Sequence, residues 1–458
     1  MLSSWLPAND QRIVAACCVL LLYVGFCILT WRRHKRSHAN SGPTSTATTL
    51  VAYASQTGFA QQLALQTATS MRSIGQSVGL ESIRDVGIER LASAERILFV
   101  VSTTGEGDAP DPAANFVRSV LAASAQLQRL SYAILALGDR QYDNFCGFGH
   151  RLDSWLRHQG ATPLFDVVEV DNGDEGALRH WQHQLGVLAG APDLPDWDTP
   201  RYDRWRLTER GLLNPGSAGL PCFHLTLRPT DPAATWTAGD IAEIDPANST
   251  WVSEAGQTLP HREYSIASIP ADGAIELLVR QMRRPGGEVG IGSGWLTETA
   301  PLDGEIALRV RSNPNFHPPT DLQPLLLIGN GTGLAGLRAI LKARIAGGAH
   351  RNWLFFGERH RAADYFHENE IELWHRQGCI ERLDVVFSRD QSERLYVQHR
   401  LLSHASEVRE WAAAGASIYV CGSLEGMAPA VDAALREILG ADALEQLLIT
   451  GRYRRDVY

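Results

Sequence analysis

The sequence has 458 residues, of which 44% are hydrophobic and 20% charged, the balance of a globular protein with room for about three domains. Its 42 Lys and Arg against 51 Asp and Glu give a net charge of −9, which argues against a general nucleic-acid binder because phosphate contacts need a basic field. Seven scattered cysteines without a Cys-X-X-Cys motif exclude a disulfide scaffold, and a mean hydropathy of −0.15 excludes a protein with many membrane spans.

An uncharged apolar segment runs from Ile13 to Trp31, and a basic cluster follows it directly at residues 32–36. At about 1.5 Å per residue the segment matches the hydrocarbon thickness of a bilayer, and the basic flank favours the cytoplasmic side. A cleaved signal peptide, which carries its charge before the apolar run, and a buried core helix are the alternatives. We predict a membrane anchor over residues 1–36, a flexible tether over residues 37–49, and a single-pass protein of the inner (cytoplasmic) membrane with its soluble domains in the cytoplasm.

Three loops rich in glycine or hydroxyl groups follow short apolar runs that are typical of buried parallel strands, at residues 50–54, 96–101 and 132–137. The first loop leads into a helical pattern, so its N–H groups and hydroxyls suit a phosphate, although a Ser or Thr there is also an ordinary helix cap. Open α/β sheets bind ligands at the carboxyl ends of their strands. The candidate residues are Ser55, Gln56, Thr57, Gly58, Phe59 and Ala60, then Thr103, Thr104, Gly105, Glu106 and Gly107, then Leu137, Gly138, Asp139, Tyr142 and Phe145, with Asp171 in a fourth loop.

After a Pro- and Asp-rich linker at residues 189–205, short β-like runs separated by turns predict a small antiparallel barrel over residues 206–320. Within it, Arg262, Tyr264 and Ser265 offer a cation for a pyrophosphate, an aromatic face and a hydroxyl. A predicted helix that starts near Gly290 offers N–H groups to a second phosphate. An ordinary strand and a capped helix are the alternatives. The candidate residues of this helix start are Gly290, Gly292 and Ser293.

Residues 325–336 predict a strand, a Gly-X-Gly-X-X-Gly loop and the start of a helix that runs to about Ala346, which is the pattern of a dinucleotide site. The acidic residue that contacts the ribose of NAD is not obvious. Two arginines and a hydroxyl follow a later strand instead, and this set suits a ribose 2′-phosphate, which favours NADP. The candidate residues are Gly331, Thr332, Gly333, Ser388, Arg389, Arg394, Tyr396 and Gln398.

These motifs carry a family resemblance. Residues 50–188 resemble a flavodoxin domain that binds FMN, and residues 206–458 resemble a ferredoxin–NADP reductase module with an FAD-binding barrel (206–320) and an NADP-binding domain (321–458). The order is that of the NADPH-dependent diflavin reductases, with the sulfite reductase flavoprotein subunit and the microsomal NADPH–cytochrome reductase nearest in pattern. The implied fold is α/β: a flavodoxin-like doubly wound parallel sheet, an antiparallel β-barrel, an α/β NADP-binding domain and one N-terminal transmembrane helix.

The resemblance also implies roles. The three loops would hold FMN with Tyr142 stacked on its ring. Arg262, Tyr264, Ser265 and the 290–293 turn would hold FAD, and Tyr458 would cover the FAD ring. The hydride path would be surrounded by Ser265, Cys421 and Asp456. The 2′-phosphate and adenine end of NADPH would lie against Ser388, Arg389, Arg394 and Tyr396.

The sequence departs from the resembled family between Asp240 and Arg262, where only 21 residues stand in place of a helical connecting insert. Phe59 stands where an Asn is common in that family, and Thr104 stands where some members have a second stacking aromatic. No metal is assigned, because the histidines show no ligand spacing.

We predict an enzyme that passes electrons from NADPH through FAD and FMN to a heme protein or ferric-chelate reductase at the membrane. The alternatives are a subunit that feeds a sulfite reductase hemoprotein and a non-catalytic membrane scaffold with decayed flavin sites.

Overall fold

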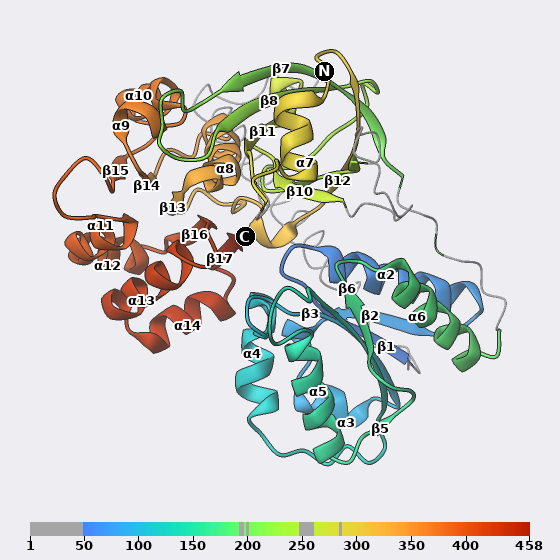
Figure 1. The fold of residues 1–458 in the computed structure, drawn as a ribbon. Helices are drawn as coiled ribbons and strands as arrows, with labels where there is room; N and C mark the ends of the chain where they lie inside the picture. The colour runs from blue at the N-terminus through green and yellow to red at the C-terminus, as the bar shows by residue number, and fades with distance from the viewer. Residues whose placement is uncertain (1–48, 192–196, 198–200, 247–260, 284–285) are drawn as a thin grey trace, which may run out of the picture. The chain divides into compact units, whose positions relative to one another are not determined.

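The computed structural model describes residues 49–191, 197, 201–246, 261–283 and 286–458, and Thr49–Tyr458 forms one compact unit (Figure 1). The predicted anchor (1–36), and all of the predicted tether except Thr49, lie outside the described residues. Within the described ranges, no helix combines the length and the apolar character needed to cross a bilayer. The predicted inner-membrane location is therefore corrected, because the described residues include no helix that could span the membrane.

The first part of the described chain is a doubly wound α/β structure. Its elements are β1 (Thr49–Ala54), α2 (Phe59–Ser73), β2 (Val78–Ser82), α3 (Ile88–Ser93), β3 (Arg96–Ser102), α4 (Ala114–Phe116), β4 (Ser131–Gly138), α5 (Gly147–His158), β5 (Thr162–Pro163), β6 (Val168–Asp171) and α6 (Glu175–Leu188). The sheet is parallel, with the order β2-β1-β3-β4-β5 and β6 also paired to β4. Alternate residues of the apolar strands pack on α3, α4 and α5 on one face and on α2 and α6 on the other. The predicted flavodoxin-like sheet is confirmed.

The middle part is an antiparallel barrel. Its elements are β7 (Asp203–Leu212), β8 (Cys222–Pro229), β9 (Ile241–Ile244), β10 (Arg262–Ser265), β11 (Ile275–Arg280), α7 (Ile291–Gly294) and β12 (Glu305–Arg311). The strands follow the order β10-β9-β12-β7-β8-β11, and a bridge between Ile266 and Leu277 joins the two ends. Inward-facing apolar side chains such as Trp205 and Leu225 fill it. The predicted antiparallel sheet is confirmed, and its first strand starts inside the segment expected to be a linker.

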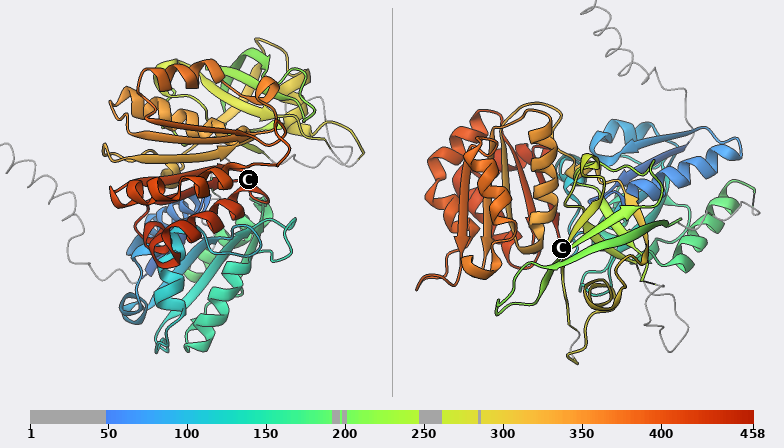
Figure 2. Two further views of the ribbon diagram at one scale, coloured as in Figure 1. Left: turned by 90° about the vertical axis from the view of Figure 1, so that its left-hand side faces the viewer. Right: turned by 90° about the horizontal axis from the view of Figure 1, so that it is seen from above.

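The last part is a second parallel α/β structure. Its elements are β13 (Leu325–Asn330), α8 (Leu334–Ala346), β14 (Asn352–Glu358), α9 (Arg361–Asp364), α10 (Glu368–Arg376), β15 (Arg382–Phe387), α11 (Val397–Ser403), α12 (Ala405–Ala413), β16 (Ser417–Gly422), α13 (Met427–Leu439), α14 (Ala441–Ile449) and β17 (Tyr453–Val457). The strand order β15-β14-β13-β16-β17 reverses between β13 and β16, where such sheets open a crevice for ligands. The turned views show helices on both faces of this sheet (Figure 2).

Candidate functional site

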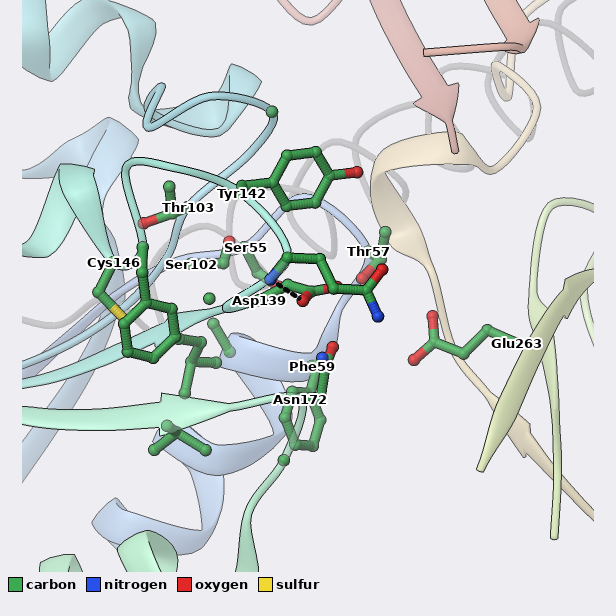
Figure 3. Close-up of a pocket in the computed structure, with 18 of the residues that line it drawn as sticks. Ser55, Thr57, Phe59, Ser102, Thr103, Asp139, Tyr142, Cys146, Asn172 and Glu263 are labelled. Atoms are coloured by element: carbon green, nitrogen blue, oxygen red, sulfur yellow. Dashed lines mark hydrogen bonds between the residues drawn. The ribbon is translucent and has the colours of Figure 1, made fainter. Parts of the chain in front are cut away.

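A cavity of about 510 Å³ lies at the carboxyl ends of β1, β3 and β4, where the sequence places its three loops (Figure 3). Predicted residues that line it are Ser55, Thr57, Phe59, Ala60, Thr103, Gly105, Leu137, Gly138, Asp139, Tyr142 and Phe145. Residues that were not predicted for this cavity also line it: Ser102, Gln141, Asn144, Cys146, Val170, Asn172, Gly173, His261, Arg262 and Glu263. Among them, Arg262 was predicted to hold FAD, and it lines this first cavity and not the second. His261, Arg262 and Glu263 come from β10 and the residue before it, 116 to 208 positions away from the loop residues, and no local pattern connects them with these loops.

Six predicted residues do not line this cavity: Gln56, Gly58, Thr104, Glu106, Gly107 and Asp171. Two of them, Thr104 and Asp171, shape the loops around the cavity. Thr104 pairs with Asp108 in a tight turn, and the Asp171 carboxylate accepts a 3.1 Å hydrogen bond from the backbone N–H of Arg140 in the third loop. The fourth loop therefore reaches the cavity through Asn172 and Gly173, the residues that follow Asp171.

The donors of this cavity suit a phosphate and a flat ring. The hydroxyls of Ser55 and Thr103 are buried and have no hydrogen-bond partner among the described residues, which is the state of groups that serve a ligand. Helix α2 starts directly after Gly58 without a side-chain cap, so the N–H groups of its first turn are open to an anion. Beneath the third loop, burial raises the pKa of Cys146 to about 12, which keeps this thiol neutral.

A second cavity of about 910 Å³ lies between the barrel and the last sheet. Ten residues predicted for FAD or NADPH line it: Tyr264, Ser265, Gly331, Thr332, Ser388, Arg389, Tyr396, Gln398, Asp456 and Tyr458. Tyr458 is 54% exposed at its edge. Sequence motifs that lie up to 194 positions apart thus meet in one cavity, at the switch point of the last sheet.

The floor of this cavity holds a polar centre. The Ser265 hydroxyl donates a 2.8 Å hydrogen bond to Oδ2 of Asp456, and Sγ of Cys421 lies 3.7 Å from the same oxygen. β17 pairs in register with β16, which sets Asp456 opposite Cys421. All three side chains are buried, and burial raises the pKa of Asp456 above its usual range. Cys421 does not itself line the cavity and acts through its contact with Asp456.

The far end of the second cavity is basic. Ser388 is buried at the end of β15 and Arg389 beside it is exposed, and both line the cavity. Arg359, which the sequence analysis missed, lines it as well, and Arg280 does so while paired at 2.6 Å with Glu358. The predicted Arg394 lies in the loop before Tyr396 but does not line the cavity.

The turn predicted for a second phosphate lies behind the cavity wall. The hydroxyl of Ser293 accepts a hydrogen bond from the N–H of Met282, and Gly290 donates to the Met282 carbonyl, so this turn supports a residue that lines the cavity. A Cβ on Gly292 would overlap the Arg262 side chain, which shows that Arg262 packs directly on this turn. Gly333, another predicted residue, packs behind the cavity on the backbone of β16.

The two cavities share a wall. Thr57 and Glu263 line both, one from the first loop and the other from β10. Figure 3 shows Glu263 extending from its strand toward Thr57 across the first cavity. The short segment that replaces the connecting insert ends before Arg262. The next residue, Glu263, lies where the two cavities meet.

A cluster of acidic side chains and a histidine lies at this wall: Glu243, His261 and Glu263 have possible ligand atoms within 4.8 Å of one another. Both carboxylates are already paired, Glu243 with Arg309 and Arg311, and Glu263 with Arg311. Because the arginines satisfy these charges, we describe the cluster as an ion-pair network and assign no metal.

Comparisons with known proteins agree with this geometry. The family described as flavodoxin matches residues 51–181, and the oxidoreductase NAD-binding domain family matches residues 327–433. The chain is 27% identical to the sulfite reductase [NADPH] flavoprotein alpha-component of Neisseria meningitidis serogroup C, with 88% of each chain covered. It is 27% identical to the protein of the same description from Vibrio vulnificus, with 89% and 87% covered. The first alignment runs over 539 positions, more than the 458 residues of this chain, so that relative carries residues that this chain lacks.

These matches decide between two of the alternatives. A flavodoxin domain and an oxidoreductase NAD-binding domain in series, each with its cavity, oppose the interpretation as a non-catalytic scaffold. The chain has the domain order of the diflavin reductases, and it is an NADPH-dependent flavoprotein oxidoreductase whose cofactors are FMN, FAD and NADPH.

Proposed function

We propose that this chain is an electron-donating flavoprotein of the sulfite reductase type, which takes electrons from NADPH and passes them to a hemoprotein partner. The observation that carries the proposal is the wall that the two cavities share at Thr57 and Glu263. Two adjoining cavities give electrons a short route without an intervening domain. The extended similarity to sulfite reductase flavoproteins supports the partner class.

In this proposal the first cavity holds FMN and the second holds FAD together with the nicotinamide end of NADPH. When bound, NADPH supplies a hydride to FAD, and FMN delivers the electrons one at a time. The first loop and the start of α2 bind the phosphate of FMN, and Tyr142 covers its ring.

The proposed domain boundaries follow from this assignment. Residues Ala189–Tyr202 join the FMN domain to the barrel, and the NADP-binding domain starts near Asp321.

The polar centre of the second cavity orients the reacting groups. Asp456 fixes the Ser265 hydroxyl and the Cys421 thiol, and its carboxylate places a negative charge where the nicotinamide ring becomes positive. Tyr264 supplies an aromatic face beside this centre, and Tyr458 closes the outer edge until the nicotinamide enters.

The test uses the purified full-length chain. It is expected to bind one FMN and one FAD, to reduce ferricyanide with NADPH, and to reduce the heme of a sulfite reductase hemoprotein component, followed as a change in the heme spectrum. Reduction of ferricyanide without reduction of that heme would leave the flavoenzyme intact and contradict the proposed partner. Absence of FMN or FAD after reconstitution would contradict the assignment of the cavities.

Replacing Arg389 by alanine is expected to raise the KM for NADPH by about 10- to 100-fold and to leave that for NADH unchanged. A guanidinium bound to a phosphate contributes about 1.5–3 kcal/mol, and only NADPH carries the 2′-phosphate. Steady-state ferricyanide reduction with each nucleotide measures the effect. Arg376→Ala is the matched control, because Arg376 is an exposed residue at the end of α10 in the same domain. An equal loss with both nucleotides would contradict this role.

A further inference from the structure

The loop that begins after β1 has two sides, and only one faces the first cavity. On the cavity side lie the Ser55 hydroxyl, which has no partner among the described residues, and the uncapped start of α2. On the other side the backbone carbonyls of the loop meet a segment of the reductase part, Arg311–Asn315, that starts at the last residue of β12. The loop is thus enclosed between a ligand site and another part of the chain.

Asn315 holds the first half of the loop. Its side-chain amide donates hydrogen bonds to the carbonyls of Ser55, at 2.6 Å, and of Gln56, at 3.0 Å. One amide group that bridges two successive carbonyls fixes the orientation of the peptide between them, and with it the direction of the N–H groups on the cavity side.

Arg311 holds the second half. Its guanidinium donates to the Thr57 carbonyl and, at 3.1 Å, to the Thr57 hydroxyl. Arg311 is buried and is paired with Glu243 and Glu263, so its position is fixed by the barrel and not by the loop.

Gly58 completes the contact. It has a φ of +88°, and a Cβ at this position would overlap the carbonyl oxygen of Ser312. Glycine is therefore required here twice, for the left-handed backbone that starts α2 and for the close approach of the reductase part. Every residue from Ser55 to Gly58 touches the segment Arg311–Asn315.

A second set of contacts reinforces the first. The Gln56 side chain donates to the carbonyl of Arg455 in β17 at 2.8 Å and accepts from the N–H of Asp111 at 2.8 Å, while Asp111 and Arg455 form an ion pair. Gln56 was predicted to contact the cofactor, and the structure shows it facing the reductase part instead.

We infer that the segment Arg311–Asn315 is a positioning element of the FMN phosphate site. It holds the phosphate loop in its binding conformation, so FMN affinity and docking of the reductase part on the FMN domain are thermodynamically linked. Linkage is reciprocal: bound FMN strengthens docking by the same factor by which docking strengthens FMN binding. The inference rests on the proposed assignment of the first cavity to FMN, and it implies that the phosphate, not the ring, carries the linkage.

The test compares FMN with riboflavin, which has the same ring and no phosphate, on the full-length chain freed of FMN. Asn315→Ala removes two hydrogen bonds to the loop and is expected to weaken FMN binding about tenfold and riboflavin binding less than about twofold, measured by flavin fluorescence. Asn369→Ala, at an exposed position of α10, is the matched control and is expected to change neither affinity. Retention of FAD reports that the variant has folded.

The reciprocal effect is measured by hydrogen exchange. Removal of FMN from the unmodified chain is expected to speed exchange at residues 311–315, and riboflavin is expected not to restore protection. If Asn315→Ala does not retain FAD, Asp111→Asn provides the second variant, with the same loss expected for FMN over riboflavin. Equal weakening of both flavins, or no weakening of either, would overturn the linkage. Failure of the unmodified chain to bind FMN at all would instead overturn the assignment of the first cavity.

Discussion

Replacing Asp456 by asparagine is expected to slow reduction of the enzyme by NADPH by about a hundredfold or more. The carboxylate accepts the Ser265 hydroxyl at 2.8 Å and lies 3.7 Å from the Cys421 sulfur, in a buried position where electrostatic effects are large. Asparagine keeps the shape and an acceptor oxygen but removes the charge that stabilises a nicotinamide ring as it becomes positive. Stopped-flow absorbance of the flavin at saturating NADPH measures the step directly.

The control for this variant is Asp442→Asn, an exposed carboxylate of α14 that does not line either cavity. It is expected to reduce flavin at the unmodified rate. If Asp456→Asn weakened NADPH binding but left the rate at saturation unchanged, the residue would be part of the binding site only, and the role in orienting the reacting groups would be wrong.

The same residue predicts how the rate and the stability depend on pH. Burial raises the pKa of Asp456, so the rate of flavin reduction is expected to fall as pH drops through this raised value, before an ordinary aspartate of pKa about 3.9 would protonate. The native protein binds this proton more tightly than the unfolded chain does. The contribution of Asp456 to the free energy of unfolding therefore decreases as pH rises from the ordinary to the raised pKa, and it stays unfavourable above that window.

Asp456→Asn is expected to remove the pH dependence of both quantities. At neutral pH the variant is expected to reduce flavin more slowly and to have a free energy of unfolding no lower than that of the unmodified chain. Urea unfolding followed at several pH values, beside the pH profile of flavin reduction, measures both effects. A variant that kept the acid limb of the rate profile would show that another group titrates there.

Replacing Gly333 by alanine is expected to destabilise the last sheet by about 1–3 kcal/mol and to lower kcat/KM for NADPH. Gly333 has an ordinary φ of −58°, so the effect is one of space. A Cβ would overlap the carbonyl group of Cys421 and lie 2.6 Å from Cα of Gly422. These are backbone atoms of a central strand, which cannot move aside as a flexible side chain can, so α8 and the Gly331–Thr332 turn must shift.

Gly87→Ala is the control, because a Cβ there meets no atom within 4 Å and its φ of −100° suits alanine. Chemical unfolding and NADPH titration of both variants measure the difference. Equal stability of Gly333→Ala and the unmodified chain would contradict the close packing of α8 against β16.

The sequence by itself determined the fold class and most of the cavity-lining loops. Apolar runs such as 96–101 and 132–137 are buried parallel strands because two layers of helices cover them, and glycines and hydroxyls follow them because ligand sites form at the carboxyl ends of such strands. The loop at Ser55, the ring loop at Tyr142 and the turn at Gly331 were all located in this way. Local hydrophobic period and turn chemistry contain this information.

Only the tertiary structure decided which of these pieces meet. Asp456 reaches Ser265 and Cys421 because β17 pairs with β16 at the edge of the last sheet. The register of two strands that are far apart in the sequence cannot be predicted from the residues of either strand alone. Likewise, Arg311 holds Thr57 across 254 positions, and Asn315 binds carbonyls that every loop has. Because every residue has a backbone carbonyl, contacts of this kind cannot be recognised from the types of residue in the loop. The junction of the two cavities at Thr57 and Glu263 therefore follows from the packing of the two halves and not from any motif.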